Sequence, residues 1–435
     1  MSRLVSPTPS VHSGDTAAWI AVFAGVSAAL HVGKLAPALP VLRTALDIDL
    51  LQAGFLLSMV QLAGMSLGLL IGLSADSLGL RRSMLTGLML QVAASTVGAF
   101  ARDVSSLLFL RALEGLGFLL VVMPAPAIIR QMVSPMHLSR MLGVWGAYMP
   151  GGTALALLIG PLWITLPGQW GGWSGWWLLL SALSLVAAGF VWHGIPADGR
   201  RILPTKTAAT PLMQHAMTVS WWSRLRLTLG SKGPWLVALC FAVYAGQWQA
   251  VVGFLPSIYA QSGVDAGWIG VMSAGVAAVN VIGNIASGRL LQRGWQAVHL
   301  LRIGYLAMAL GAFLCFAESG VGATEGWQLS ATLRYVAVLG FSAIGGLIPG
   351  TLFMLSVRLA PSDSTVSTTV GFMQQLSALG QFAGPPLVAS VALAAGGWRW
   401  TWLVTGGCSV LGLVLVRQVN RSLESKANPN KPNTD

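Results

Sequence analysis

The chain has 435 residues, of which 55% are hydrophobic and only 9% are charged. A soluble domain carries about 25% charged residues, so this chain cannot cover a water-facing surface and must fold in lipid. Its formal net charge of +12 would suggest a nucleic-acid partner for a soluble protein. Here, however, the arginines lie mostly between apolar runs, where they set membrane topology and attract anionic headgroups. We therefore expect membrane lipids, and no nucleic acid, as partners.

Twelve apolar runs follow one another along the chain, and each is long enough to cross a bilayer as a helix, which takes about 20 residues. They predict an all-α integral membrane protein with twelve transmembrane helices. The first run is too long for the apolar core of a cleavable signal peptide. The runs are residues 17–39, 50–73, 83–100, 105–131, 139–162, 176–194, 234–258, 267–290, 297–317, 329–357, 366–394 and 400–417.

A long basic connection after the sixth run divides the chain into two groups of six. Trp221 and Trp222 stand there beside Arg224 and Arg226, a mixture typical of a short helix lying in the headgroups. A plain solvated linker is the alternative. The expected segments are a cytoplasmic N-terminal tail (1–16), an N-terminal six-helix bundle (17–194), a cytoplasmic linker (195–233), a C-terminal six-helix bundle (234–418) and a cytoplasmic C-terminal tail (419–435).

The distribution of Lys and Arg predicts the orientation of the chain. With both termini in the cytoplasm, most of the 25 basic residues fall on the cytoplasmic side, as the positive-inside rule requires. This favours a protein of the cytoplasmic (inner) membrane. The exceptions are three arginines in outer loops and three basic residues within the runs, namely Arg43, Arg102, Arg399, Lys34, Arg111 and Arg334.

The outer connection 167–175 is uncharged and rich in tryptophan. Trp170 and Trp173 lie in it, and Trp176 and Trp177 follow directly. Tryptophan is enriched at the membrane–water interface, so these four side chains are expected to form an interfacial aromatic anchor.

The loop between the second and third runs carries a distinctive set of residues. Gly72 allows close approach of another helix, and Gly79 allows a tight reversal. Asp76 is not required by topology, so we expect it to act as a latch that pairs with Arg130 and with the first turn of the eleventh run. A generic basic loop is the alternative. The expected latch residues are Gly72, Asp76, Gly79, Arg81, Arg82 and Arg130.

The second half of the chain repeats this pattern weakly. After its second run comes the stretch 288–294, which contains Gly288, Arg289 and Gly294 but has Gln292 where an acid would match Asp76. Such an echo in two six-span halves is typical of a duplicated transporter.

Two charged residues lie within the fourth run. Arg111 and Glu114 are three residues apart and therefore share a helix face, with Gly115 and Gly117 beside them. Charges at this depth cost several kcal/mol unless they are paired or hydrated, so they predict a polar interior. The fifth run contains a glycine-rich stretch, 143–152, which is interrupted by Pro150.

These motifs resemble those of the major facilitator superfamily, and the resemblance covers the whole chain. Residues 72–82 are similar to its loop motif, residues 111–117 to its fourth-helix motif, and residues 143–152 imperfectly to the fifth-helix motif of its antiporters. No Gly-Pro pair precedes the final glycines, which argues against a drug antiporter. Residues 31–40 faintly resemble the cyanate-transporter-like branch.

The resemblance implies two halves that rock around a central cavity, which moves a small solute by alternating access. Polar residues on the cavity helices are then the candidate site, although each Asn or Gln is equally suited to bonding between helices, and Lys34 to reaching the interface. The expected substrate-binding residues are His31, Lys34, Gln61, Arg111, Tyr244, Gln247, Asn280, Asn284, Arg334 and Gln374, with Gln381 on the face of Gln374.

The charges within the runs indicate the substrate. Lys34, Arg111 and Arg334 outnumber the single acid Glu114, which favours a small anion or carboxylate. Glu114 is the candidate for proton coupling. A drug or metabolite efflux antiporter, and a transporter-derived sensor without flux, are the alternatives.

Other classes find little support in the sequence. Gly64, Ser66 and Gly68 match the hydrolase pattern G-x-S-x-G, but within an apolar run and without a partner set, so we do not expect an enzyme. A channel is less favoured, because duplicated halves suit alternating access.

We expect no phosphate-binding loop, no metal, no cofactor and a monomeric carrier. Three cysteines in apolar runs are expected to pack, namely Cys240, Cys315 and Cys408.

Overall fold

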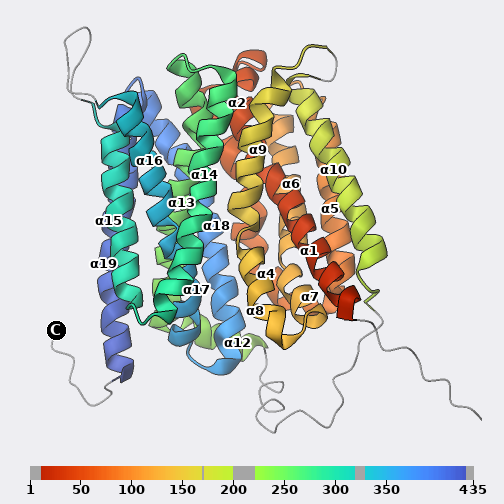
Figure 1. Ribbon diagram of the computed structural model, residues 1–435, viewed down its shortest axis with the longest axis vertical. Helices are drawn as coiled ribbons and strands as arrows, with labels where there is room; N and C mark the ends of the chain where they lie inside the picture. Colours follow the sequence, from red (N-terminus) through yellow and green to blue (C-terminus); the bar gives the residue numbers. More distant parts are fainter. Residues whose placement is uncertain (1–10, 169–170, 199–220, 319–328, 428–435) are drawn as a thin grey trace, which may run out of the picture.

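The computed structural model describes residues 11–168, 171–198, 221–318 and 329–427. Within these ranges every regular element is a helix, and the long helices run side by side along one common direction (Figure 1). The side chains of some helical residues, 71–78 among them, lie outside the description. The all-α fold class expected from the sequence is confirmed.

The helices up to α10 form the first group. Most of the apolar runs in it are split into two helices. The elements are α1 (Val11–Gly33), α2 (Leu35–Ala45), α3 (Leu50–Ser58), the 3-10 turn η1 (Met59–Gln61), α4 (Leu62–Leu78), α5 (Leu80–Gly98), α6 (Val104–Val122), α7 (Ala125–Met132), α8 (Pro135–Gly146), α9 (Tyr148–Ile164) and α10 (Gly172–Gly194).

The second group starts with the short helix α12, which lies where a surface helix was expected. Its place in the headgroups stays a prediction. The elements are α12 (Trp221–Leu229), α13 (Lys232–Gln261), α14 (Ala266–Gln292), α15 (Ala297–Phe316), α16 (Ala331–Gly345), α17 (Leu347–Leu359), η2 (Asp363–Thr365), α18 (Val366–Ala394), η3 (Trp398–Trp400) and α19 (Thr401–Ala427).

Proline accounts for four of the helix breaks. Each of α1, α6, α8 and α16 ends four residues before a proline, at Gly33, Val122, Gly146 and Gly345. Proline has no N–H, so the carbonyl four residues earlier loses its hydrogen bond, and the ring crowds that carbonyl. The bend between α8 and α9 is 40°. The prolines are Pro37, Pro126, Pro150 and Pro349.

Ten helical stretches in the described ranges are long and apolar enough to cross a membrane, and eleven if the bent pair α8–α9 counts as one span. The run expected at 83–100 is not among them, because Arg81, Arg82 and Gln91 lower the hydropathy of α5. Each of the twelve expected runs nevertheless coincides with one helix or one broken helix.

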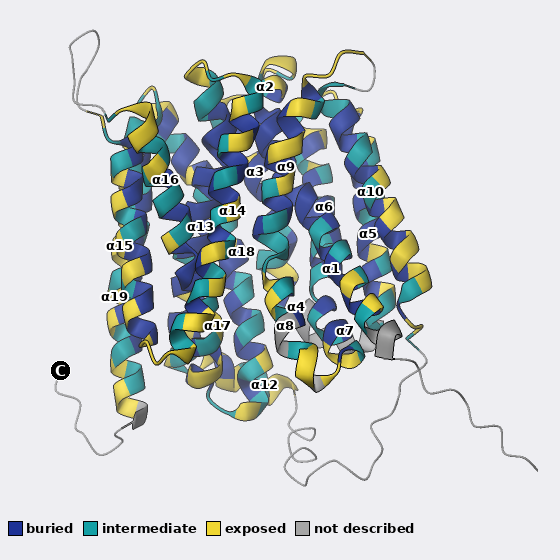
Figure 2. Ribbon diagram, viewed as in Figure 1, coloured by how far each residue is buried: buried dark blue, intermediate teal, exposed yellow. Residues whose placement is uncertain are grey.

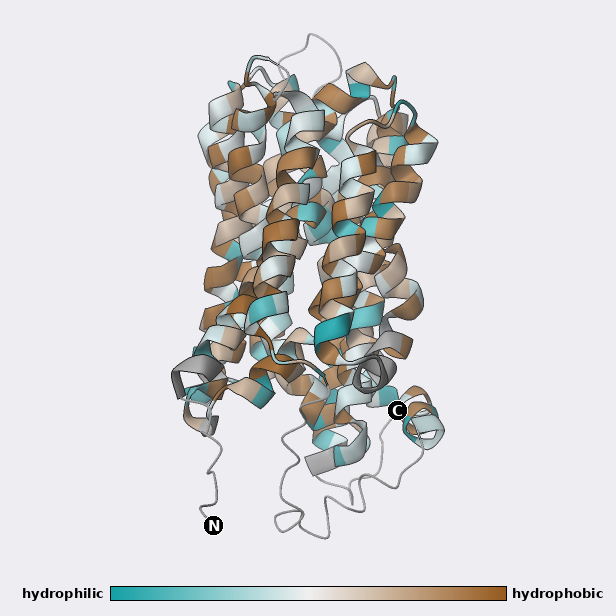
Figure 3. Cartoon of the chain, turned by 90° about the vertical axis from the view of Figure 1, so that its right-hand side faces the viewer, coloured by the Kyte–Doolittle hydropathy of each residue, from teal (hydrophilic) through white to brown (hydrophobic). Residues whose placement is uncertain are grey.

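The outer surface of the helices is apolar. Exposed side chains lie along α15 and α19, where Leu306, Leu310, Val410 and Leu411 are each at least half exposed (Figure 2). Hydrophobic residues continue along most of the length of the helices in Figure 3. Lipid tails can cover such a surface and water cannot, so the protein is an integral membrane protein.

Small residues let neighbouring helices approach closely. A Cβ on Gly117 of α6 would lie 2.7 Å from the carbonyl oxygen of Gly87 on α5. Between the two groups, a Cβ on Gly54 of α3 would lie 2.9 Å from Cα of Pro386 on α18. The groups also meet where α2 packs on α13, α4 on α18 and α9 on α14. Close packing of this kind replaces the hydrophobic effect as the cause of helix association in lipid.

The turn between α4 and α5 depends on Gly79, whose φ of +82° is accessible at little cost only to glycine. Asp198, which follows α10, accepts hydrogen bonds from the backbone N–H groups of Arg81 and Arg82 at 2.9 and 3.0 Å. Its carboxylate therefore satisfies free N–H groups at the start of α5. The guanidinium of Arg81 lies 4.8 Å from the ring of Trp192 and donates to the carbonyl of Trp192.

The expected latch is only partly visible. The surroundings of Gly72 and the side chain of Asp76 lie outside the description, and Arg130 is exposed in the last turn of α7. The pairing of Asp76 stays a prediction. The role of Asp198 was not foreseen, because a residue more than a hundred positions away supplies the cap.

The expectation of a tryptophan anchor was wrong for Trp176 and Trp177. Both are buried, because α10 already begins at Gly172 and turns these two side chains towards the helices beside it. Trp170 lies outside the described residues.

Candidate functional site

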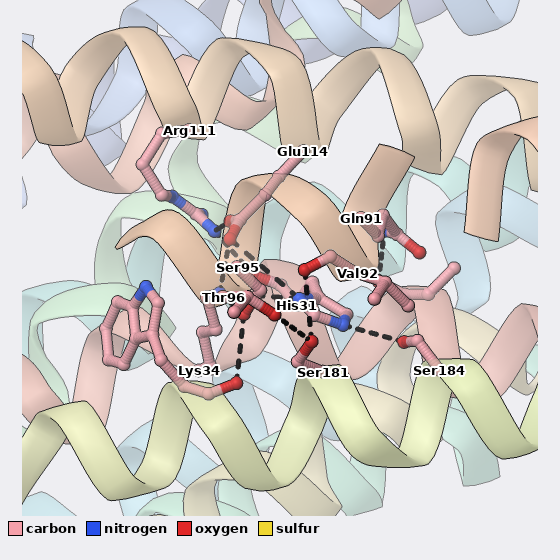
Figure 4. A network of polar contacts seen from close by, with 12 residues as sticks. His31, Lys34, Gln91, Val92, Ser95, Thr96, Arg111, Glu114, Ser181 and Ser184 are labelled. Atoms are coloured by element: carbon pink, nitrogen blue, oxygen red, sulfur yellow. Dashed lines mark hydrogen bonds and ion pairs between the residues drawn. The ribbon is translucent and has the colours of Figure 1, made fainter. Parts of the chain in front are cut away.

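Glu114 stands at the centre of a buried charged network in the first group of helices (Figure 4). One carboxylate oxygen accepts from Nζ of Lys34, at the break between α1 and α2, and the other from Nη1 of Arg111, one turn earlier on α6, at 2.7 Å. The three side chains are at most 1% exposed. Arg111 and Glu114 share a face of α6 as predicted, and the structure shows that they pair there. The alternative in which Lys34 reaches the membrane interface is wrong.

The ammonium group of Lys34 is held from several sides. It donates to Oγ of Ser95 on α5 at 2.8 Å and lies 3.3 Å from Nδ1 of His31. It also lies 4.5 Å from the centre of the Trp177 ring. Nε1 of Trp176 donates to the backbone carbonyl of Lys34 at 3.1 Å, which fixes the break between α1 and α2.

Arg111 also forms hydrogen bonds with backbone carbonyl groups of two other helices. Its Nη1 donates to the carbonyl of His31 at 2.6 Å, and its Nε approaches the carbonyl of Leu56 at 3.4 Å. Nη2 is buried and has no hydrogen-bond partner among the described residues. The network therefore holds two cations against one carboxylate, with one guanidinium nitrogen left to bind a further acceptor.

Hydroxyl groups extend the network along α1, α5 and α10. Nε2 of His31 lies 2.8 Å from Oγ of Ser184, which lies 3.1 Å from Oγ of Ser27. Ser95 donates to the carbonyl of Trp177 at 3.0 Å. These serines were not foreseen. For Ser27, the sequence signal was its spacing of four residues from His31, which puts both side chains on one face of α1. Ser95 and Ser184 come from other helices, so spacing could not indicate them.

The second group of helices contains a neutral polar cluster. Nδ2 of Asn280 donates to the hydroxyl of Tyr244 at 3.0 Å and to the carbonyl of Ser342 at 2.9 Å. Nδ2 of Asn284 lies 3.0 Å from Oδ1 of Asn280. Gln247 does not join this cluster, because its Oε1 accepts from Ser409 on α19 at 3.1 Å.

Glutamines connect the two groups of helices. Nε2 of Gln61, at the break η1, donates to Oε1 of Gln381 on α18 at 3.0 Å. Gln375 binds two backbone groups one turn apart on α4, the carbonyl of Met65 at 2.8 Å and the N–H of Leu69 at 3.2 Å. Gln374 was expected to bind substrate, whereas its neighbour Gln375 makes the contact between the groups.

Arg334 lies apart from the buried network. It pairs with Glu318 at 3.0 Å, at the start of α16, and its Nε donates to the carbonyl of Cys315 at 2.7 Å. Both partners are partly exposed. In the described ranges, no group of three or more His, Cys, Asp or Glu side chains could hold a metal ion.

A family model and individual relatives, compared with this sequence, point to the same family. A model described as Major Facilitator Superfamily matches residues 20–385 and 237–434. The chain is 23% identical to an uncharacterized MFS-type transporter, YtbD, of Bacillus subtilis (strain 168), over 89% of this chain and 91% of that protein. It is 24% identical to the cyanate transport protein CynX of Escherichia coli (strain K12), over 91% of this chain and 95% of that protein.

A chloramphenicol resistance protein of Pseudomonas aeruginosa is 25% identical over 64% of this chain, and the match spans only 61% of that protein. Among solved structures, a bacterial homolog of the human lysosomal transporter Spinster, in an inward-facing and unoccupied conformation, has a TM-score of 0.75 at 16% identity, over 97% of this chain and 99% of that chain. A D-xylose–proton symporter has a TM-score of 0.72 at 14% identity, over 92% and 97%. The fold of these transporters is thus the fold described above.

Proposed function

Because the chain belongs to the Major Facilitator Superfamily, we propose that it is a secondary active transporter for a small anion or carboxylate. It would work by alternating access in the cytoplasmic membrane, with both termini inside and coupling to protons. It would act as a monomer on a small-molecule substrate, and not as an enzyme. The domain limits given above belong to the same proposal.

The observation that carries this proposal is the charge of the buried network. Lys34 and Arg111 bring two cations to Glu114, and Nη2 of Arg111 has no partner among the described residues. An unpaired charge inside a membrane protein is costly, so a bound anion would stabilise this network. A guanidinium binds a carboxylate or similar planar anion in a defined direction.

The remaining candidate residues would serve recognition and movement. Tyr244, Asn280 and Asn284 offer neutral hydrogen-bonding groups from the second group of helices, and His31 supports the charged network from the first. Gln61 and Gln375 bind the α3–α4 segment to α18 and would have to release or exchange these bonds when the groups rotate.

The loop between α4 and α5 would bias this rotation. We keep the sequence-based proposal that Asp76 latches the cytoplasmic side in the outward-open state, with Arg130 and the start of α18 as its partners. Such contacts are each worth about 0.3–2 kcal/mol, which shifts a balanced equilibrium severalfold.

Counterflow in proteoliposomes tests the transporter class. Vesicles loaded with unlabelled cyanate, and separately with acetate, should take up the labelled anion transiently against its gradient. A channel would only dissipate the gradient, and a sensor without flux would do neither. Counterflow of chloramphenicol but of neither anion would favour the efflux antiporter and contradict our substrate class.

A further inference from the structure

Four side chains form an unbroken line of polar contacts that leads away from Glu114. Nζ of Lys34 lies 3.3 Å from Nδ1 of His31. Nε2 of His31 lies 2.8 Å from Oγ of Ser184, and that oxygen lies 3.1 Å from Oγ of Ser27. All four residues are at most 2% exposed. Figure 4 shows Lys34, His31 and Ser184 of this line.

The donor and acceptor properties of these groups determine in which direction each hydrogen bond is donated. An ammonium group can only donate, so Nδ1 of His31 must accept from Lys34. Nε2 of the neutral ring then carries the hydrogen and donates to Ser184. Ser184 can in turn donate its own hydrogen to Ser27. Each donor therefore meets an acceptor from Lys34 to Ser27, which lies one turn closer to the start of α1 than His31.

Glu114 is poorly placed to carry the mobile proton itself. Both of its oxygens accept from cations, and its Oε1 lies 4.0 Å from Nδ1 of His31. The charged groups that face His31 are Lys34, directly after the end of α1, and Arg111 and Glu114 on α6, whereas α10 contributes the hydroxyl of Ser184. Glu114 thus suits the role of a fixed counter-ion.

We propose that Lys34, His31, Ser184 and Ser27 are the proton relay of this carrier. The proposal rests on the anion transport argued above and names the route of its coupling ion. In the forward step the Nζ–H bond of Lys34 breaks and a bond to Nδ1 of His31 forms. The hydrogen on Nε2 passes to Ser184, that of Ser184 passes to Ser27, and that of Ser27 leaves to a water molecule.

This step balances, because one proton leaves and only Lys34 changes its charge. His31 ends as the other neutral tautomer, and each serine regains one hydrogen. The network then holds one cation and one carboxylate, so its attraction for a substrate anion falls. Return of a proton to Lys34 by the same route, with the His31 tautomer reset, restores the extra positive charge. Proton movement and anion affinity are thereby linked.

Ser184 offers a sharp test, because it touches the relay and not the cation pair. Ser184→Ala removes the hydroxyl between His31 and Ser27, and Ser184→Thr retains one. In proteoliposomes, Ser184→Ala should lower the accumulation of labelled cyanate driven by a pH gradient by about tenfold or more. Counterflow without a gradient should stay within about twofold, and Ser184→Thr should restore accumulation. Accumulation at the wild-type level in Ser184→Ala would overturn the relay.

The ¹⁵N NMR signals of His31 test the relay independently of which substrate the carrier moves. In ¹⁵N-histidine-labelled protein in lipid nanodiscs, His31→Gln identifies the His31 signals among the six histidines. We expect hydrogen on Nε2 at neutral pH, and a shifted Nε2 signal in Ser184→Ala. The relay places hydrogen on Nδ1 only after Lys34 has given up its proton, so hydrogen on Nδ1 in the wild type at low pH, where Lys34 is charged, would overturn it. If the wild type shows no counterflow of cyanate, the proposed transport of that anion fails, and this spectrum still decides the relay.

Discussion

The two groups of helices have similar architecture but different polar interiors. The first buries Lys34, Arg111 and Glu114 in one charged network, whereas the second buries the neutral cluster around Tyr244 and Asn280. A neutral cluster can orient a ligand, but only the charged network can change its net charge when a proton moves. We infer that coupling belongs to the first group and that the second mainly provides recognition.

The turns that follow α4 and α14, one in each group of helices, also differ in charge. Gly79 and Gly294 both adopt positive φ, at +82° and +88°, in corresponding turns. The helix after the first turn, α5, is capped by the carboxylate of Asp198. The helix after the second, α15, follows Gln296, which makes no side-chain cap. The positive-φ glycine of the repeat is thus retained, while a capping carboxylate is described only at the first of the two turns.

The largest effect is expected from Glu114→Ala. It leaves Lys34 and Arg111 buried without their counter-ion, which should cost about 3–5 kcal/mol of unfolding free energy. The free energy can be measured by reversible unfolding in mixed micelles. A Lys34→Met, Glu114→Gln double variant should recover part of this loss, since it removes one of the two cations. Equal stability of Glu114→Ala and the wild type would mean that the network is not charged.

A smaller effect is expected from Asn280→Ala in the neutral cluster. The hydroxyl of Tyr244 and the carbonyl of Ser342 lose a donor, which should cost about 1–2 kcal/mol. Substrate affinity should fall, while the number of protons moved per substrate should stay the same. A changed proton stoichiometry in this variant would contradict the division of roles between the two groups.

Asp198→Ala tests the loop difference. Loss of this cap at the start of α5 should lower stability by about 1 kcal/mol, whereas Gln296→Ala at the start of α15 should change it by less than about 0.5 kcal/mol. Thermal unfolding of both variants in the same lipid is the measurement. Equal losses in the two variants would contradict the claim that only the first turn depends on a side-chain cap.

The smallest effect is expected from Arg334→Ala. Its pair with Glu318 is partly exposed, and such pairs contribute about 0–1 kcal/mol. Gradient-driven uptake should also remain. A large loss of uptake in Arg334→Ala would instead support the sequence-based prediction that Arg334 binds substrate.

Much of the fold could be read from the sequence, because apolar length and proline position are local properties. The pairing of Arg111 with Glu114 followed from a spacing of three on one helix. The partner Lys34 lies at the break between α1 and α2, and its contact with Glu114 depends on how α1, α5 and α6 pack. Helix packing in three dimensions was not available from spacing alone.

The same limit explains the misplaced residues. Gln374 and Gln375 are the same residue type, but neighbouring helix positions point about 100° apart, and it is Gln375 that forms hydrogen bonds with α4. Trp176 and Trp177 were taken for interfacial residues because the start of α10 was placed too late. A shift of four residues at a helix end suffices to bury such side chains.

The central claim is that an anion binds the excess positive charge at Arg111, and anion titration of thermal stability tests it most directly. Cyanate and acetate should be titrated against the wild type, Arg111→Gln and the control Arg334→Gln. We predict that at least one anion raises the unfolding temperature of the wild type and of Arg334→Gln by mass action, and leaves Arg111→Gln unchanged. Arg111→Lys, which lacks the second guanidinium nitrogen, serves if Arg111→Gln does not unfold cooperatively. An equal rise in the Arg111 variant, or no rise with either anion in the wild type, would contradict the account.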